Sequence, residues 1–324
     1  MDLNIKLQSR VTPSPLERGQ GGEAKLIIAG GNGFLGGVLA NHFQKKFNNI
    51  VILTRHPKAS HQNIRYVVWD AKTLGNWKDE LNHCDVLINL TGKNVNCRYT
   101  QKNKTEILNS RLDSTRILGE AIREVENPPK LWLQASSSTI YNHAYQPNDE
   151  NSNNIGDDFS MTVCKQWERT FWEEFCPSTK KILMRVAIVL GNGGGALPTI
   201  KHLTHFGLGG QQGDGTQMIS WIHEHDFARA TEWLMEHGKS NGVYNVCAPT
   251  PVCNNAFMKT LRQAMLVPIG LTTPTWMLKL GASIIGTETE LVLKSRYVKP
   301  ANLLREGFQF QNPTLGVALI TLCQ

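Results

Sequence analysis

The chain has 324 residues, of which 40% are hydrophobic and 19% charged, and its formal net charge is +7. This composition is ordinary for a globular protein and excludes collagen-like, disordered and disulfide-scaffold classes. Seven cysteines without a C-x-x-C pair predict reduced thiols, and the scattered Lys and Arg residues give no basic run for nucleic acid.

No segment predicts a membrane span or a secretory signal, so we expect a cytoplasmic protein. Residues 1–24 contain Pro, Gly and mixed charge without an apolar run, which predicts a disordered leader. The apolar stretch at 273–286 is too short to cross a bilayer, and Lys279 interrupts it. It is typical of an amphipathic helix.

From Lys25 onward, short apolar runs alternate with helix-length segments. The predicted strands cover 25–29, 51–54, 66–69, 85–90, 131–136, 182–190, 218–222 and 242–248, and the predicted helices cover 34–47, 101–124, 159–175 and 226–236. This alternation predicts an α/β fold with a Rossmann-type, doubly wound parallel sheet. We assign 25–190 and 223–250 to a dinucleotide-binding domain, and 191–222 and 251–324 to a smaller, mostly helical substrate lobe.

A glycine-rich bend between the first strand and the first helix is the strongest local motif. Its glycines are typical of a turn that lets backbone amides approach a pyrophosphate at a helix N-terminus. An ordinary strand-to-helix turn is the alternative. The expected contact residues are Gly30, Asn32, Gly33, Phe34, Leu35 and Gly36.

The end of the second strand favours NADP over NAD. An NAD site places an acid there for the ribose hydroxyls, but this strand ends in Thr54 and Arg55. A guanidinium can pair with a 2′-phosphate in bidentate fashion. A solvated surface arginine is the alternative interpretation.

Later strand ends offer further cofactor contacts, because ligands bind outside the carboxyl ends of parallel strands. Asp70 follows the third strand and is expected to accept from the adenine amino group. The segment after the fourth strand, Asn89, Leu90, Thr91 and Gly92, is expected to pass beneath the ribose. Asp70 and Asn89 are also common turn formers, and that alternative stays open.

Together the motifs resemble the extended short-chain dehydrogenase/reductases, and more closely an atypical branch of sugar-nucleotide-epimerase-like proteins with a distinctive C-terminal (DUF1731-type) domain. The resemblance runs from about Lys25 to Pro313. It rests on GGNGFLG, NLTGKNVN, NSRLDSTRILGEAI, VCKQWE, RVAIVLGNGGGALP, GLGG, SWIHEHDFARA and SRYVKP. It implies a nicotinamide cofactor, a small-molecule substrate, a cofactor contact at Arg111 and pairing of relatives through helices at 101–124 and 159–175.

The family's catalytic Ser and Y-x-x-x-K motif are only partly present. By this resemblance Ser137 stands in the place of the catalytic serine and Lys165 in that of the lysine that contacts the ribose, but Met161 replaces the tyrosine. A thioether has no proton to exchange. Tyr141 is our first candidate for a substitute acid–base group, and Cys164 is a distant second.

On the substrate side, the resemblance points to two segments. Gly193 and Gly194 are expected to supply amides to an anion or to form a flexible lid. Gln217 and Trp221 are expected to line the pocket, although a strand tryptophan is more often in the core. His223 and His225 alternate at a strand end without a third ligand, so no metal site is predicted.

Two functions remain open at this stage. The first is an NADP-dependent oxidoreductase or epimerase-like enzyme that acts on a small polar carbinol or carbonyl compound. The second is an NADP-binding regulator or scaffold without turnover, which Met161 favours.

Overall fold

The structure is a computed structural model, and it describes residues 24–278, 288 and 290–323. Its centre is a parallel sheet of seven strands in the order β10-β6-β5-β4-β1-β2-β3. These strands are β1 (Lys25–Ala29), β2 (Asn49–Thr54), β3 (Ile64–Val68), β4 (Val86–Asn89), β5 (Leu131–Ser137), β6 (Lys180–Val186) and β10 (Gly242–Val246). The predicted Rossmann-type α/β fold is confirmed.

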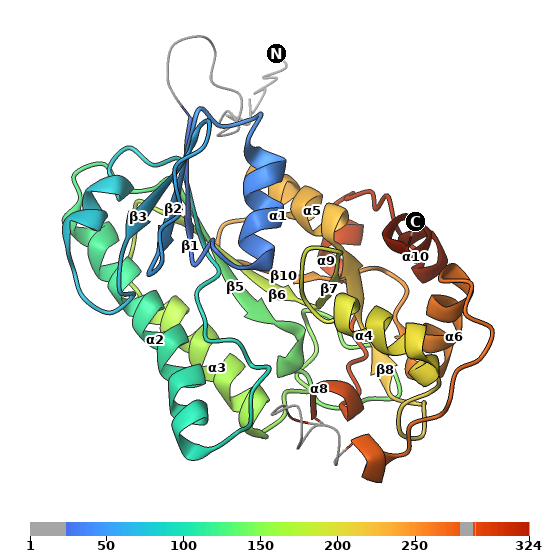
Figure 1. The fold of residues 1–324 in the computed structure, drawn as a ribbon. Coiled ribbons are helices and arrows are strands. Elements are labelled where there is room, and N and C mark those ends of the chain that lie inside the picture. Colours follow the sequence, from blue (N-terminus) through green and yellow to red (C-terminus); the bar gives the residue numbers. More distant parts are fainter. Residues whose placement is uncertain (1–23, 279–287, 289, 324) are drawn as a thin grey trace, which may run out of the picture.

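Helices cover both faces of this sheet (Figure 1). On one face α1 (Phe34–Phe43) packs beside α5 (Glu224–His237), and on the other α2 (Gln101–Glu124) packs along α3 (Phe159–Glu173). The inner strands are largely buried on both sides, as expected for a parallel sheet between helical layers, whereas the edge strand β3 is partly exposed. The short 3-10 helices η1 (Asn76–Leu81) and η2 (Ser138–Ile140) follow β3 and β5.

The strand predicted over 182–190 is two strands. β6 ends at Val186, and β7 (Ile188–Leu190) pairs with β9 (Trp221–His223) in a separate two-stranded sheet. The change of direction is fixed by the Ala187 backbone N–H, which donates to Val246 O of β10 at 3.1 Å. The chain therefore leaves the main sheet one residue after β6.

A smaller group of elements lies beyond the β10 edge of the sheet (Figure 1). It contains α4 (Leu197–Leu203), the one-turn π-helix η3 (Thr204–Leu208), β8 (Met218–Ile219), β11 (Val252–Cys253), α6 (Asn254–Ala264), α8 (Glu290–Leu293), α9 (Ala301–Arg305) and α10 (Leu315–Cys323). α6 packs on α10 around buried apolar side chains. Residues 275–278 are helical, and the remainder of the amphipathic helix predicted at 273–286 lies outside the described residues.

The segment Arg296–Lys299 joins this group to the main sheet. Its backbone is held by Met218 O, by the Ser220 hydroxyl and by a two-way bridge with Asn148, whose N–H donates to Tyr297 O at 2.7 Å. The Arg296 backbone N–H donates to Met218 O at 2.7 Å. The position of Arg296 is therefore set by contacts with several parts of the fold.

In the ranges 24–278 and 290–323, no helix is both long and apolar enough to cross a bilayer.

Candidate functional site

The bend after β1 has a backbone shape that requires glycine. Gly30 has a φ of +73°, and a Cβ atom there would lie 2.8 Å from the Thr91 Cα. A Cβ on Gly36 would lie 2.2 Å from the Gly31 carbonyl oxygen, so the first turn of α1 packs directly on the bend. Gly33 differs from both, because a Cβ there would meet nothing within 4 Å. The bend is thus closed toward the protein and open at Gly33.

The N-terminus of α1 leaves its amides available at this opening. Gly33 is the N-cap residue, so no side chain accepts from the first amides of the helix, and the first turn carries no acidic residue. Such amides are unsatisfied donors that favour an anion. Two polar atoms at the bend, Asn32 Oδ1 and Thr91 Oγ1, are buried and have no hydrogen-bond partner within residues 24–278 and 290–323. These features fit a dinucleotide diphosphate.

Arg55 stands at the end of β2, in a loop that is fixed on both sides. The Thr54 hydroxyl accepts from the His56 backbone N–H at 3.2 Å, and Asn32 Nδ2 donates to the His56 carbonyl at 2.8 Å. Arg55 itself is exposed and forms no ion pair with the described residues. The bend therefore holds Arg55 beside it with its guanidinium unpaired.

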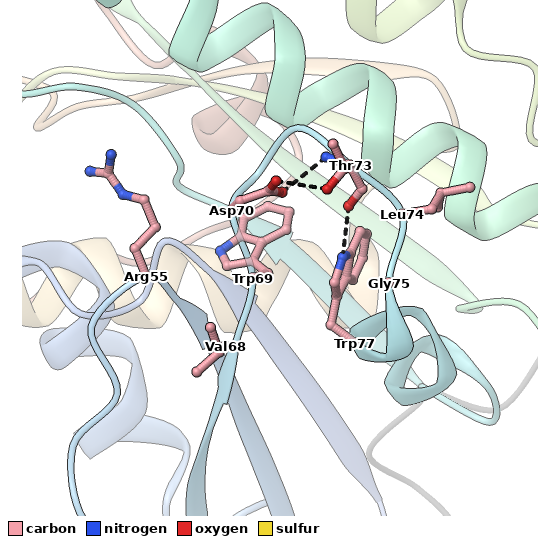
Figure 2. Close-up of a pocket in the computed structure, with 8 residues that line it drawn as sticks. All are labelled: Arg55, Val68, Trp69, Asp70, Thr73, Leu74, Gly75 and Trp77. Carbon is pink, nitrogen blue, oxygen red and sulfur yellow. Dashed lines mark hydrogen bonds between the residues drawn. The ribbon is translucent and has the colours of Figure 1, made fainter.

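A cavity of about 360 Å³ lies beside Arg55, at the ends of β2 and β3. Figure 2 shows Arg55 and Asp70 on the same edge of the sheet, with the Trp69 ring next to Asp70. Asp70 accepts from the Lys72 and Thr73 amides and from the Thr73 hydroxyl, at 2.7–2.9 Å. The hydrogen bond from the Thr73 backbone N–H is the main cause of the lowered pKa of Asp70. Asp70 thus forms the turn that shapes the cavity, and its carboxylate is one of the groups that line it.

The segment after β4 lies directly over the glycine bend. Asn89 is fully buried: its Oδ1 accepts from the Thr91 N–H at 3.0 Å, and its Nδ2 donates to Gln134 at 3.0 Å. Asn89 therefore positions the loop rather than facing outward. The Leu90 side chain packs on the core, as do those of Phe34 and Leu35 in the bend. All three side chains stay partly exposed, so both their backbone and their apolar surface are open to a cofactor.

Arg111 lies beneath this loop. A Cβ on Gly92 would come within 2.9 Å of the Arg111 guanidinium carbon, so the guanidinium lies directly against this glycine. The guanidinium donates to the carbonyls of Lys93 and Ile107 and lies 5.1 Å from the Trp167 ring centroid. Burial lowers its pKa. This cation has no carboxylate partner among the described residues.

At the end of β5, Ser137 belongs to a row of hydroxyl groups. The Ser137 hydroxyl donates to Thr139 Oγ1 at 3.1 Å, and that same oxygen accepts from Arg296 Nε at 2.9 Å. Ser137 and Thr139 are partly exposed, whereas Arg296 is 7% exposed. The sequence interpretation assigned no role to Arg296, although it lies in the SRYVKP motif.

On α3, Met161 and Lys165 lie one turn apart. Met161 is 4% exposed, and its sulfur fills the space that a Cβ on Gly156 would need. It packs where the family tyrosine would stand. Lys165 is partly exposed and pairs with Asp157. Burial raises the pKa of Cys164, on the same helix, to about 12, so its thiol stays protonated near neutral pH.

Tyr141 is fully buried in a polar network below the serine row. Its hydroxyl donates to Asn245 Oδ1 at 3.0 Å and accepts from Arg185 at 2.8 Å, and Arg185 forms a bidentate pair with Glu168. Burial raises the pKa of Tyr141 to about 12. Both the burial and these partners argue against the predicted acid–base role of Tyr141.

The two predicted substrate segments lie in different surroundings. The loop with Gly193 and Gly194 lies against Phe34 at the start of α1, where a Cβ on Gly194 would come within 2.8 Å of the Phe34 Cβ. Trp221 is fully buried in the core beside α6 and α10, and its indole donates to Thr250 O at 3.2 Å. Gln217 is 6% exposed and donates to Gln212 O at 2.9 Å. The loop with Gly193 and Gly194 thus lies beside the glycine bend, whereas Trp221 is a core residue.

The geometry defines a dinucleotide-binding Rossmann protein of the extended short-chain dehydrogenase/reductase type. Residues 26–165 match the model of the NAD dependent epimerase/dehydratase family, and 273–322 match the domain of unknown function DUF1731. An epimerase family protein of Staphylococcus aureus is 34% identical over 297 residues, which cover 90% of this chain and 97% of that protein. A Staphylococcus saprophyticus epimerase family protein is 33% identical over 295 residues, which cover 90% of this chain and 97% of that protein. The chain therefore belongs to this epimerase family.

Solved structures show the same fold. The human epimerase family protein SDR39U1 (isoform 2), crystallised with NADPH, has a TM-score of 0.81 and 28% identity, over 92% of this chain and 99% of that chain. A nucleoside-diphosphate sugar epimerase from Corynebacterium glutamicum has a TM-score of 0.73 and 26% identity, over 93% of this chain and 58% of that chain.

Proposed function

We propose that the chain is an NADP-dependent oxidoreductase or epimerase-like enzyme that acts on a small polar carbinol or carbonyl compound. The observation that carries the proposal is the unpaired Arg55 beside the open glycine bend and the cavity at the ends of β2 and β3. The human relative crystallised with NADPH supports the same cofactor.

Each part of the cofactor has a matching group in this chain. The α1 amides and the Asn32 and Thr91 oxygens, which have no partner among the described residues, suit the diphosphate. The partly buried Arg111 lies against Gly92, in the loop next to the glycine bend, and adds a positive charge. Arg55 suits a 2′-phosphate, because a guanidinium binds phosphate in bidentate fashion. The cavity beside Asp70 suits the adenine.

When bound, the nicotinamide supplies a hydride to a carbonyl carbon or accepts one from a carbinol carbon. Ser137 donates a hydrogen bond to the substrate oxygen and so orients it. Lys165, released from Asp157, donates to a ribose hydroxyl. Met161 exchanges no proton, so proton transfer to the substrate oxygen is left to Ser137 and water.

The experiment that tests this proposal is a titration of the purified protein with NADPH and with NADH. We expect NADPH to bind more tightly, and Arg55→Met to weaken NADPH binding about 10- to 100-fold while leaving NADH binding unchanged. Arg116→Met, an exposed arginine on α2, is the control and should change neither. Equal binding of both dinucleotides by the unmodified protein would refute the preference, and no binding of either would refute the function.

A second candidate function is an NADP-binding regulator without turnover. It is favoured by Met161, which packs in place of a phenol, and by Tyr141, whose hydroxyl is engaged inside the protein. Incubation of the NADPH-loaded protein with a broad panel of aldehydes and ketones separates the two functions. Oxidation of NADPH by any of them, absent in Ser137→Ala, supports the enzyme.

A further inference from the structure

Arg296 is a buried cation that the fold brings to the reacting end of the site. It comes from the C-terminal part of the chain, 157 residues from the Thr139 whose hydroxyl it contacts at 2.9 Å. Met218 and Ser220 fix its backbone. Two consecutive hydrogen bonds, Arg296 to Thr139 and Ser137 to Thr139, connect it to the serine.

The guanidinium is only partly satisfied by the protein. Nε donates to Thr139 Oγ1 and one Nη to the Lys294 carbonyl at 3.1 Å, and the other Nη has no hydrogen-bond partner among the described residues. No carboxylate within the described ranges forms an ion pair with it. Burial lowers its pKa, although Glu290 and Asp158 act in the opposite direction from a longer distance.

Those two carboxylates are engaged elsewhere. Asp158 contacts Lys294, and Glu290 Oε1 accepts from Lys294 at 3.2 Å and from the Ser160 hydroxyl at 2.5 Å. They therefore surround the neighbouring lysine rather than Arg296. A buried charge without a direct partner is costly, and an anionic ligand would offset that cost.

The bound dinucleotide has other cations for its own phosphates. Arg111 lies under the Gly92 loop and Arg55 at the end of β2, both on the side of the glycine bend. Arg296 contacts the hydroxyl row that follows β5. Arg296 is therefore left to bind the substrate rather than the phosphates of the dinucleotide.

We propose that Arg296 binds an oxyanion of the substrate, a carboxylate or a phosphate group, while Ser137 holds the reacting oxygen. The inference rests on the proposed function and narrows its substrate class to small anionic hydroxy or oxo compounds. The partly exposed hydroxyls of Ser137 and Thr139 complete the site, because Thr139, which accepts from both Ser137 and Arg296, keeps its own proton to donate to the same molecule.

Binding of matched probes tests this without turnover. Calorimetric titrations compare malonate with malonamide, and glycerol 3-phosphate with glycerol, on the NADP-loaded and on the cofactor-free protein. We expect one anion to bind at least about 10-fold more tightly than its neutral counterpart. Arg296→Met should remove that preference, because it should lower the affinity for the anion about 10- to 100-fold. The pair that shows the preference identifies carboxylate or phosphate.

The controls separate this inference from the proposed function. Arg169→Met, a 79% exposed arginine on α3 paired with Glu173, should leave all four affinities unchanged. Arg296→Lys keeps the charge but loses the guanidinium fork, so it should lower the affinity for the anion and not for the neutral probe. This variant tests the inference even if Arg296→Met does not fold. NADPH affinity should be unchanged in Arg296→Lys. Anions that bind no better than neutral probes, or bind Arg296→Lys and Arg296→Met as tightly as the unmodified protein, overturn the inference, whereas absent NADPH binding overturns the proposed function alone.

Discussion

The two halves of the candidate site differ in how far the protein satisfies its own polar groups. At the ends of β1 and β2, neither the Arg55 guanidinium nor Asn32 Oδ1 has a partner among the residues that the structure describes. At the end of β5 and along α3, Tyr141 is hydrogen-bonded internally and Lys165 is paired with Asp157. The first half thus leaves polar groups open, whereas in the second half the polar groups are engaged by the protein itself.

This difference teaches that cofactor binding and acid–base chemistry depend on separate features of the same fold. The proposed dinucleotide contacts come from a glycine bend and a strand-end arginine, because backbone amides and a helix N-terminus favour a pyrophosphate. Acid–base chemistry needs a titratable group in reach of the substrate. Met161 has none.

The largest expected effect is on stability, at Met161. Met161→Ala removes a side chain that is 4% exposed and should lower the free energy of unfolding by about 2–5 kcal/mol. NADPH affinity, measured by titration of the folded variant, should stay the same. Gln166→Ala, exposed on the same helix, is the control. A loss of cofactor affinity without a loss of stability would mean that Met161 belongs to the binding half.

Next in size is the effect of closing the open bend. Gly33 has extended backbone angles that any residue adopts, and a Cβ there meets no protein atom within 4 Å. Gly33→Val should therefore keep the fold but weaken NADPH binding about 100-fold, which is about 2.8 kcal/mol. Gly37→Ala, in equally open space inside α1, should bind NADPH normally. Equal affinities in both variants would place the diphosphate elsewhere.

Tyr141→Phe should have an intermediate effect, confined to stability. The variant leaves Arg185 and Asn245 without their shared partner and should lower the unfolding free energy by about 1–3 kcal/mol, measured by chemical denaturation. NADPH binding and any carbonyl-dependent NADPH oxidation should match the unmodified protein. Turnover abolished in the folded variant would restore Tyr141 as the acid–base group.

The smallest effect is expected where α1 is attached to α5. A hydrogen bond from His42, with help from Lys46, lowers the pKa of Glu232 to about 2. A lowered carboxyl pKa stabilises the folded state above its ordinary value of 4.5, and this stabilisation is lost as the pH falls toward 2. Glu232→Gln should cost about 1 kcal/mol at pH 7, and the difference should shrink below pH 4.5 in denaturation curves taken across this range. A constant difference across that range would contradict the assignment.

The sequence was sufficient to predict the sheet, because its strands are apolar runs and several of their connections are long enough for a helix. It was also sufficient for the bend, since a left-handed Gly30 and a tightly packed Gly36 both demand glycine locally. The break at Ala187 could not be foreseen, because β7 acquires its own partner, β9, far along the chain.

Side-chain roles that depend on distant contacts were harder to predict. Tyr141 has the right spacing from Ser137, but its hydroxyl partner Asn245 lies 104 residues away. No separate role could be predicted for Arg296, because the Thr139 hydroxyl that its guanidinium contacts is 157 residues away. Trp221 was named as a pocket residue, with the core as the alternative, and the structure places it in the core.

The place of Arg296 near the end of the chain has a consequence for biosynthesis. The last strand of the main sheet ends at Val246, so a growing polypeptide has every strand needed for the dinucleotide half long before Arg296 leaves the ribosome. The substrate side is completed only when Arg296–Lys299 reaches the already formed strand ends. A truncated product of translation would therefore carry the glycine bend but no anchor for a charged substrate.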